Sequence, residues 1–304
     1  GTTISTAGTG ADNNNLTIQN NNISKSYYGI FTRGVASTGL LNGLNITGNT
    51  IGSNTPADFV TFRGIDIQNA AAPNVSQNEI FNLQISTNVS NAGIDIGQNV
   101  TDASVSRNKI YGLKSLSTVG YGSYGINISS GTSNVQISNN LIYDIITDGY
   151  LVNVIFNPFG IRISGGTNHK IYYNTVNMYG SFTDVTTADM SAALIITNAT
   201  ATGIDVRNNI FANSMIGGAG TKCYSIYVPS GTTFGTINNN DYYASGTNGV
   251  LGYFGADKTN LGDWAFYSGG DVNSIISNPL FNSATNLQPQ TGSPVLLAGT
   301  PVSG

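Results

Sequence analysis

Apolar and polar positions alternate in short stretches along the chain, and one pattern returns throughout it. An aliphatic residue is followed three positions later by Asn and, two positions after that, by a second aliphatic or aromatic residue. Eight copies occur, at Ile18–Asn21–Ile23, Ile46–Asn49–Ile51, Val75–Asn78–Ile80, Val105–Asn108–Ile110, Ile137–Asn140–Ile142, Ile171–Asn174–Val176, Val206–Asn209–Phe211 and Ile237–Asn240–Tyr242. Successive asparagines of this set are 28 to 35 residues apart. A period of this length indicates a repeat architecture.

A second motif, Gly-Ile-x-Ile, interleaves with the first. Its clear copies begin at Gly64, Gly93, Gly125 and Gly160, and Gly29-Ile30 and the segments 193–196 and 225–228 are partial copies. Alternation with period two predicts a strand in which the isoleucines point inward and the x residue points outward. The repeats show no helical periodicity.

A unit of about 30 residues with two or three short strands cannot bury its own apolar side, whereas stacked units bury one continuous core. We therefore predict an all-β fold, a parallel β-helix (solenoid) of about eight or more coils. We expect residues 1–245 to form the coils and residues 246–304, with Trp264, to form an irregular C-terminal capping segment of the same domain. Residues 1–12 are expected to cap the other end poorly.

The recurrent asparagines have two structural interpretations. Inside a stacked coil, each side-chain amide could bond to the asparagines above and below, forming an internal Asn ladder. Alternatively, Asn is present because it tolerates the left-handed backbone conformation of a turn. Both interpretations are structural, so these residues are not functional candidates.

These Asn-containing repeats, over about residues 16–245, resemble the right-handed parallel β-helix repeat family, which includes pectate-lyase-like and alginate-epimerase-like domains. The segment Asn278-Pro279-Leu280-Phe281 and the later Gly292-Ser293-Pro294 are similar to the closing segment of many secreted members. The resemblance implies a right-handed coil and an extracellular or cell-surface location. It does not imply an activity, because this fold hosts enzymes, adhesins and inert stalks alike.

Composition narrows the function classes. The 304 residues include 40 asparagines and 38 glycines, and 11 basic against 15 acidic residues give a net charge of −4. Eleven scattered basic residues do not form the patch that nucleic-acid binding requires. No apolar run is long enough to span a membrane. The single Cys223 and single His169 cannot form an ordinary zinc site, and His169 takes a slot that is aliphatic in other repeats, so we expect it to be packed.

The outward x residues of the Gly-Ile-x-Ile strands give the main candidate site. Stacking would place Asp66, Asp95, Asn127 and Arg162 in one column, with Asp66 and Asp95 on neighbouring coils. Two adjacent carboxylates need a cation or a shared proton, and Ca²⁺ bound by Asp66 and Asp95 would supply the cation. Arg162 would be the candidate catalytic residue of a lyase. The alternative is that both aspartates are simply solvated.

Loop lengths indicate where a concavity would form. The segments 144–159 and 179–190, which precede two of these strands, are longer than their counterparts in other repeats. Loops on a rigid scaffold commonly carry function. We therefore expect these two loops to wall the column.

A second column of candidate ligand-binding residues lies three positions after the repeated Asn, where Phe81, Tyr111 and Tyr143 would stack on consecutive coils. Aromatic rings suit a sugar or a protein partner, but stacking between coils also stabilises a sheet without a ligand. A third outward column is too irregular for the flat Thr array of an ice-binding surface.

Two function classes remain open. The low charge and the missing signatures of β-helix hydrolases and epimerases favour a non-catalytic extracellular structural or adhesive module. Its partners would be further copies of itself, end to end, or flanking domains of a larger surface protein. The alternative is a carbohydrate-active enzyme or carbohydrate-binding domain, with a calcium-dependent polysaccharide lyase as the specific candidate.

Overall fold

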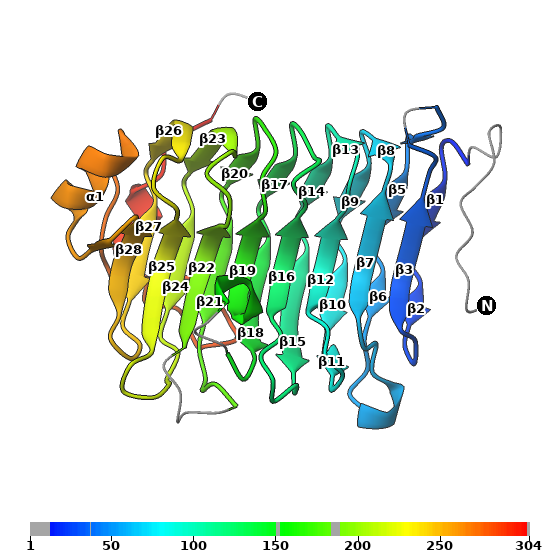
Figure 1. Cartoon of the computed structure of the whole chain (residues 1–304), viewed down its shortest axis with the longest axis horizontal. Coiled ribbons are helices and arrows are strands. Elements are labelled where there is room, and N and C mark those ends of the chain that lie inside the picture. The colour runs from blue at the N-terminus through cyan, green and yellow to red at the C-terminus, as the bar shows by residue number, and fades with distance from the viewer. Residues whose placement is uncertain (1–12, 37, 150–152, 184–188, 303–304) are drawn as a thin grey trace.

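The computed structural model describes residues 13–36, 38–149, 153–183 and 189–302, which form the predicted right-handed parallel β-solenoid (Figure 1). Three long sheets run along the coil. The first contains β1 (Thr17–Gln19), β5 (Asn45–Thr47), β9 (Asn74–Ser76), β14 (Ser104–Ser106), β17 (Gln136–Ser138), β20 (Lys170–Tyr172), β23 (Thr202–Arg207) and β26 (Thr233–Asn238). These eight stacked strands span about seven turns of the coil.

The second sheet follows the first around each coil. It contains β2 (Asn22–Ile23), β6 (Thr50–Ile51), β10 (Glu79–Phe81), β15 (Lys109–Ser115), β18 (Leu141–Ile146), β21 (Thr175–Met178), β24 (Ile210–Asn213) and β27 (Asp241–Ala244), and β11 (Gln84–Ile85) pairs with β15. The short helices η1 (Pro56–Asp58) and η2 (Val154–Phe156) lie in the connections to the third sheet.

The third sheet faces the viewer in Figure 1. It contains β3 (Tyr28–Arg33), β7 (Arg63–Gln68), β12 (Asn91–Ile96), β16 (Ser123–Ile128), β19 (Pro158–Ile163), β22 (Met190–Ile196), β25 (Lys222–Val228), β28 (Val250–Phe254) and the antiparallel β29 (Asp257–Lys258). A small sheet of β4 (Leu41–Asn42), β8 (Ala70–Ala71) and β13 (Val100–Thr101) lies in the turns that follow.

The inward orientation predicted for the Gly-Ile-x-Ile strands is confirmed. Their isoleucines are buried in one continuous core at Ile30, Ile65, Ile67, Ile94, Ile96, Ile126, Ile128, Ile161 and Ile163. The register brings equivalent residues of successive coils side by side, for example Ile65 against Ile94 and Ile94 against Ile126. The core therefore runs the length of the coil instead of being divided between repeats.

The predicted Asn ladder is also present. Each side-chain amide donates to the Oδ1 atom of the Asn in the next coil, over 2.9–3.0 Å, from Asn21 through Asn240. The same Oδ1 atom accepts the backbone N–H of the preceding Asn, as from Asn108 to Asn140 at 3.0 Å. From Asn49 onward the second amide hydrogen is bonded to a carbonyl oxygen of the preceding coil, as at Asn140 to Val105. Buried polar groups at this corner are thus satisfied along the whole column.

Left-handed turn geometry belongs to the neighbouring residue and not to the ladder Asn. The residue directly before each ladder Asn has a φ of 55° to 64°, at Asn20, Gly48, Gln77, Arg107, Asn139, Tyr173, Asn208 and Asn239. Because Gln, Arg and Tyr occupy this position as well as Asn, the stacked geometry imposes the conformation. The alternative explanation for the repeated Asn is therefore not needed.

The C-terminal end of the coil is closed by α1 (Leu261–Ser268). Trp264 of this helix is fully buried in the main core and contacts the rings of Tyr242 and Phe254 edge-on. The ladder itself ends on the buried Asp271, which accepts hydrogen bonds from Asn240, Tyr242 and Trp264 at 3.2, 2.9 and 2.6 Å. Each amide of the column donates a hydrogen bond toward the C-terminal end. A carboxylate, which only accepts hydrogen bonds, therefore terminates the column.

After α1 the chain turns back along the outside of the coil. We name residues 270–302 the C-terminal strap; it includes η3 (Pro294–Leu297). Asn177 donates to the carbonyl oxygen of Ala284 at 3.0 Å, and Asn208 and Thr300 form two hydrogen bonds of 2.8 and 2.9 Å. The strap therefore covers the outer side of several coils in addition to the end.

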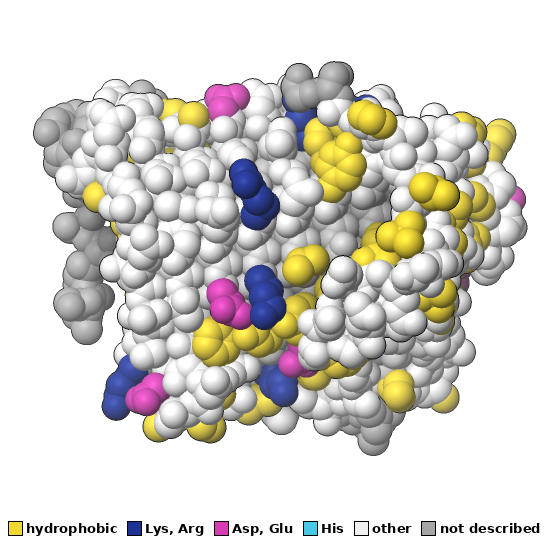
Figure 2. Space-filling model, turned by 180° about the vertical axis from the view of Figure 1, so that it is seen from behind, with side chains coloured by type: hydrophobic (Ala, Val, Ile, Leu, Met, Phe, Trp, Pro, Cys, Tyr) yellow, Lys and Arg dark blue, Asp and Glu magenta, His cyan; other side chains and the backbone are white. Residues whose placement is uncertain are grey.

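Figure 2 shows the molecule from behind, where charged side chains are few and most of the surface is neither charged nor hydrophobic. Among the described residues, no helix has the length and apolar character needed to cross a bilayer.

Candidate functional site

The main candidate residues form one column on the outer face of the third sheet. Asp66 of β7, Asp95 of β12, Asn127 of β16 and Arg162 of β19 are paired in register on consecutive strands. Each lies between two inward isoleucines, because the strand alternates its side chains between the two faces. The structure thus brings together the four residues that the motif spacing predicted to be neighbours.

A continuous hydrogen-bond chain links three of these residues. Arg162 Nη1 donates to Asn127 Oδ1, and Asn127 Nδ2 donates to Asp95 Oδ1, both at 2.8 Å. The Arg162 guanidinium also lies over the ring of Tyr124, 5.0 Å from its centroid. Arg162 is therefore held as a cation that donates a hydrogen bond, the role for which its side chain is suited.

Arg63 balances the charge of Asp95. Its Nε donates to Asp95 Oδ2 at 2.7 Å, and its Nη1 donates to the carbonyl oxygen of Ser90 at 2.5 Å. The sequence reasoning missed Arg63, although an arginine directly before the Gly64-Ile65-Asp66-Ile67 motif was a usable signal. It reaches the next coil at a point where a carboxylate would otherwise be unpaired.

Asp66 is buried beside Asp95 and has a different environment. Burial, and next the charge of Asp95, raise the pKa of Asp66 to about 7, against the lowering effect of Arg63 and of a 3.3 Å hydrogen bond from Gln68. Of the two compensations expected for adjacent carboxylates, the geometry favours a proton on Asp66 and an arginine on Asp95.

Calcium binding by this pair receives little support from the geometry. Ca²⁺ takes six to eight oxygen ligands, and the described residues contain no group of three or more His, Cys, Asp or Glu side chains arranged for a metal ion. One of the two carboxylates is also engaged by Arg63. Ca²⁺ would have to displace that arginine before it could use both aspartates.

A polar hollow of about 360 Å³ opens beside Asp66 and Asp95. Its other lining residues are Arg33, Ala36, Gln68, Asn69, Gly97, Gln98, Asn99 and Ser129. These residues lie at the ends of β3, β7 and β12 and in the turns after them and after β16. The hollow thus presents carboxyl, amide, hydroxyl and guanidinium groups at the carboxyl ends of the third-sheet strands.

The expectation that loops 144–159 and 179–190 wall this site is wrong for the part of them that the structure describes; residues 150–152 and 184–188 lie outside it. Both loops precede their strands, so they lie at the opposite end from the hollow. In the first loop, Phe156 packs on Tyr121 at 4.8 Å, and Ile155 accepts a hydrogen bond from Tyr124. The extra length covers outward aromatic rings, which form a separate hydrophobic cluster.

The second candidate column forms the predicted aromatic stack. The rings of Phe81 and Tyr111 are 5.5 Å apart at 14°, and those of Tyr111 and Tyr143 are 4.9 Å apart at 5°. At these distances the ring faces lie against one another, so both faces of Tyr111 are covered by its neighbours. Glu79 accepts from Lys109 at 2.9 Å and from Tyr111 at 3.1 Å, which ties the stack to the sheet. The arrangement favours the stabilising role over a sugar platform.

His169 is a packed residue, as expected. Its Nδ1 accepts from the backbone N–H of Val135 at 3.2 Å, and its Nε2 lies 3.1 Å from the carbonyl oxygen of Gly165. Burial lowers the pKa of His169 to about 4, so the ring is neutral at ordinary pH. Cys223 is buried and free.

Comparison of the chain with known protein families, with curated proteins and with solved structures gives no match.

Proposed function

We propose that this chain is a non-catalytic structural or adhesive module of an extracellular or cell-surface protein. The observation that carries this proposal is the internal hydrogen-bond chain of the candidate site. Arg63, Asp95, Asn127 and Arg162 are engaged with one another, so these four side chains offer no free base, and the described residues contain no metal cluster. Proton abstraction requires a group whose pKa lies near the working pH. In the column Asp66 has such a raised pKa, of about 7, but its carboxyl group is buried.

The continuous core and the Asn ladder support the role of a stiff structural module. Solenoid stability is a sum of contributions from each repeat and each interface between neighbours. Here every interface from Asn49 to Asn240 carries a buried Asn–Asn bond in addition to apolar contacts. This construction suits a stiff spacer between flanking domains or between copies of the chain.

The C-terminal end offers a surface for such contacts. Phe266 of α1 is 81% exposed and Val272 is 77% exposed, an unusual exposure for large apolar side chains at one end of the coil. Exposed apolar patches commonly mark interaction sites. We propose end-to-end association with a further copy or with a flanking domain at this surface.

Sedimentation velocity over a wide range of protein concentration tests the association. The wild-type chain is expected to form a concentration-dependent species that Phe266→Ser weakens at least tenfold. Val119→Ser, which alters an apolar side chain exposed on a different part of the coil, is the matched control. A chain that stays monomeric throughout contradicts self-association and leaves flanking domains as the neighbours.

Binding of a polysaccharide without cleavage is a second candidate, favoured by the polar hollow beside Asp66 and Asp95. Amide, carboxyl and guanidinium groups recognise sugar hydroxyls through paired hydrogen bonds, and the hollow presents all three, with Arg33 as its guanidinium. Affinity electrophoresis in gels containing pectate, alginate or chondroitin tests it. Retardation should be reduced by Gln98→Ala in the hollow and unchanged by Gln288→Ala on the strap; equal mobility with and without polysaccharide excludes it.

A further inference from the structure

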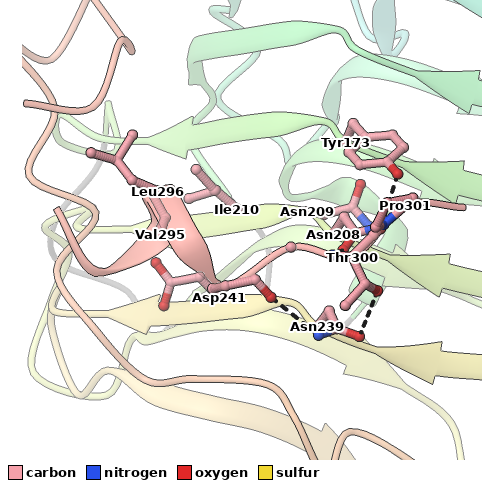
Figure 3. A pocket seen from close by; sticks show the side chains of 12 residues that line it. Tyr173, Asn208, Asn209, Ile210, Asn239, Asp241, Val295, Leu296, Thr300 and Pro301 are labelled. Atoms are coloured by element: carbon pink, nitrogen blue, oxygen red, sulfur yellow. Dashed lines mark hydrogen bonds between the residues drawn. The ribbon is translucent and has the colours of Figure 1, made fainter.

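A second pocket, away from the candidate column, lies between the strap and the coil (Figure 3). Its volume is about 510 Å³. The walls combine apolar side chains of Ile210, Val295 and Leu296 with the polar side chains of Asn208 and Asn239. This mixture of an apolar lining and a few polar groups is typical of sites for small organic ligands.

Hydrogen bonds to the coil hold the strap in place over this pocket. Asn239 Nδ2 donates to the carbonyl oxygen of Ala298 at 3.1 Å, and Tyr173 Oη donates to that of Thr300 at 3.1 Å. Asn208 both donates to and accepts from the Thr300 backbone. The pocket is therefore formed by fixed contacts before any ligand enters.

Asp241, which lines the same pocket, has an incompletely satisfied carboxyl group. The residue is 3% exposed, and its Oδ1 accepts the backbone N–H of Ser277 at 3.0 Å. Its Oδ2 is buried and has no hydrogen-bond partner among the described residues. In Figure 3 the carboxyl group lies beside Val295, on the apolar side of the pocket.

The surroundings of Asp241 supply no positive charge. The described ion pairs do not include it, and Arg207, on the neighbouring coil, is bound to Asp205. A buried carboxyl group with one neutral hydrogen-bond donor and no counter-charge is costly when it is ionised. A ligand that brings a positive charge and N–H donors removes this cost and gains a charge-assisted hydrogen bond.

We propose that this pocket binds a primary alkylammonium group, with its nitrogen at the Asp241 carboxyl group and its alkyl chain against Ile210, Val295 and Leu296. An anion would be repelled by Asp241, and a neutral alcohol would leave the charge uncompensated. A divalent cation would find one carboxylate only, because Asp241 is the one acidic residue among those that line the pocket. The site lies outside the third sheet and is independent of the proposed structural function.

Protonation of Asp241 gives the site a characteristic pH dependence. Burial raises the pKa of Asp241 to about 7, so the carboxylate is present above that pH and lost below it. An alkylammonium group stays charged up to about pH 10. Binding should therefore be strongest at pH 8 to 9 and should weaken by about tenfold for each pH unit below 7, because ligand binding then requires loss of a proton.

Calorimetric titration of the whole chain with n-butylammonium, and with n-butanol as the uncharged analogue, tests the proposal. The affinity for n-butylammonium should be at least tenfold higher at pH 8.5 than at pH 5.5, whereas n-butanol should show no such dependence. Asp241→Asn keeps the shape and the acceptor for Ser277 but should lose at least tenfold in affinity at pH 8.5. Asp102→Asn, at an exposed left-handed turn, is the charge-matched control and should bind like the wild type.

Leu296→Ser provides a second variant that does not touch a buried position, because Leu296 is 53% exposed. It shortens the apolar wall and should weaken n-butylammonium binding severalfold without affecting the fold. Absence of binding to the wild type at pH 8.5 overturns the proposal. Equal affinities of the wild type, Asp241→Asn and Leu296→Ser also overturn it, because the ammonium group would then be bound elsewhere.

Discussion

Truncation of a buried ladder residue, Asn140→Ala, should destabilise the coil far more than loss of an ordinary surface amide. Asn140 Oδ1 accepts both the backbone N–H and one side-chain N–H of Asn108, each at 3.0 Å. Both donors are buried, and the alanine leaves them without this acceptor. At about 1–3 kcal/mol for each stranded donor, the free energy of unfolding should fall by about 2–6 kcal/mol.

The matched control is Asn21→Ala, in the same column on the first described coil. Asn21 is exposed, and its amide donates to Gln19 and Asn49 at the surface. Water can replace these bonds, so the cost should stay below about 1 kcal/mol. The two variants thus carry the same substitution in the same column and differ in the burial of the side chain and in the hydrogen bonds that it accepts.

Urea unfolding followed by far-ultraviolet circular dichroism measures both variants against the wild type. A lower midpoint at an unchanged slope reports a change in stability. If Asn140→Ala and Asn21→Ala agree within about 0.5 kcal/mol, the ladder is not a major source of stability and the reasoning is refuted.

Three further changes test the electrostatics of the column and the closure of the coil. Asp66→Asn should stabilise the protein above pH 7 by up to about 4 kcal/mol. The pKa of Asp66 in the folded state, about 7, lies above its unfolded value, so the wild type loses stability as the pH rises from about 4 to 7. Urea unfolding at pH 5 and pH 8 should therefore show a smaller pH dependence of stability for the variant than for the wild type. Arg63→Gln should lower the free energy of unfolding by about 2–4 kcal/mol because it leaves the Asp95 carboxylate without its ion-pair partner. Lys25→Gln, in the exposed ion pair with Asp58, should lower it by less than about 1 kcal/mol. Equal losses in urea unfolding would contradict the importance of the buried pair. Trp264→Ala should cost about 3–5 kcal/mol and promote aggregation on light scattering, and a stable monomeric variant would show that α1 does not close the core.

The coil could be predicted from the sequence because two residue types, Asn and Ile, recur once per coil at equivalent positions. Each repeated Asn and Ile occupies the same place on every coil, so stacking follows from spacing alone. The column of Asp66, Asp95, Asn127 and Arg162 followed for the same reason, since outward residues of equivalent strands must become neighbours.

The contacts that complete this column could not be obtained from spacing. The long side chain of Arg63 extends to Asp95 on the next coil. Strand register predicts which positions are neighbours, but it does not predict how far a side chain extends. Loop length was misleading at residues 144–159, where the described part of the insertion covers Tyr121 and Tyr124 instead of enclosing a cavity.

The strap was missed because residues 246–304 lack the period that made the coils predictable. Its path back along the coil depends on single hydrogen bonds, such as those of Asn177 and Asn208 to distant carbonyl oxygens. Asp241 was therefore not among the candidates from the sequence, because its contact with the strap, at Ser277, exists only in the folded chain.

The central claim, that the Asp66–Arg162 column is structural and not catalytic, is tested most directly by one activity measurement. The chain is incubated with pectate, alginate and chondroitin in the presence of Ca²⁺, and the ultraviolet absorbance of unsaturated products is followed over time. We predict no increase above a protein-free control on any of the three polysaccharides. A sustained increase that Arg162→Gln or Asp95→Asn abolishes in a folded variant would contradict the account and identify a lyase.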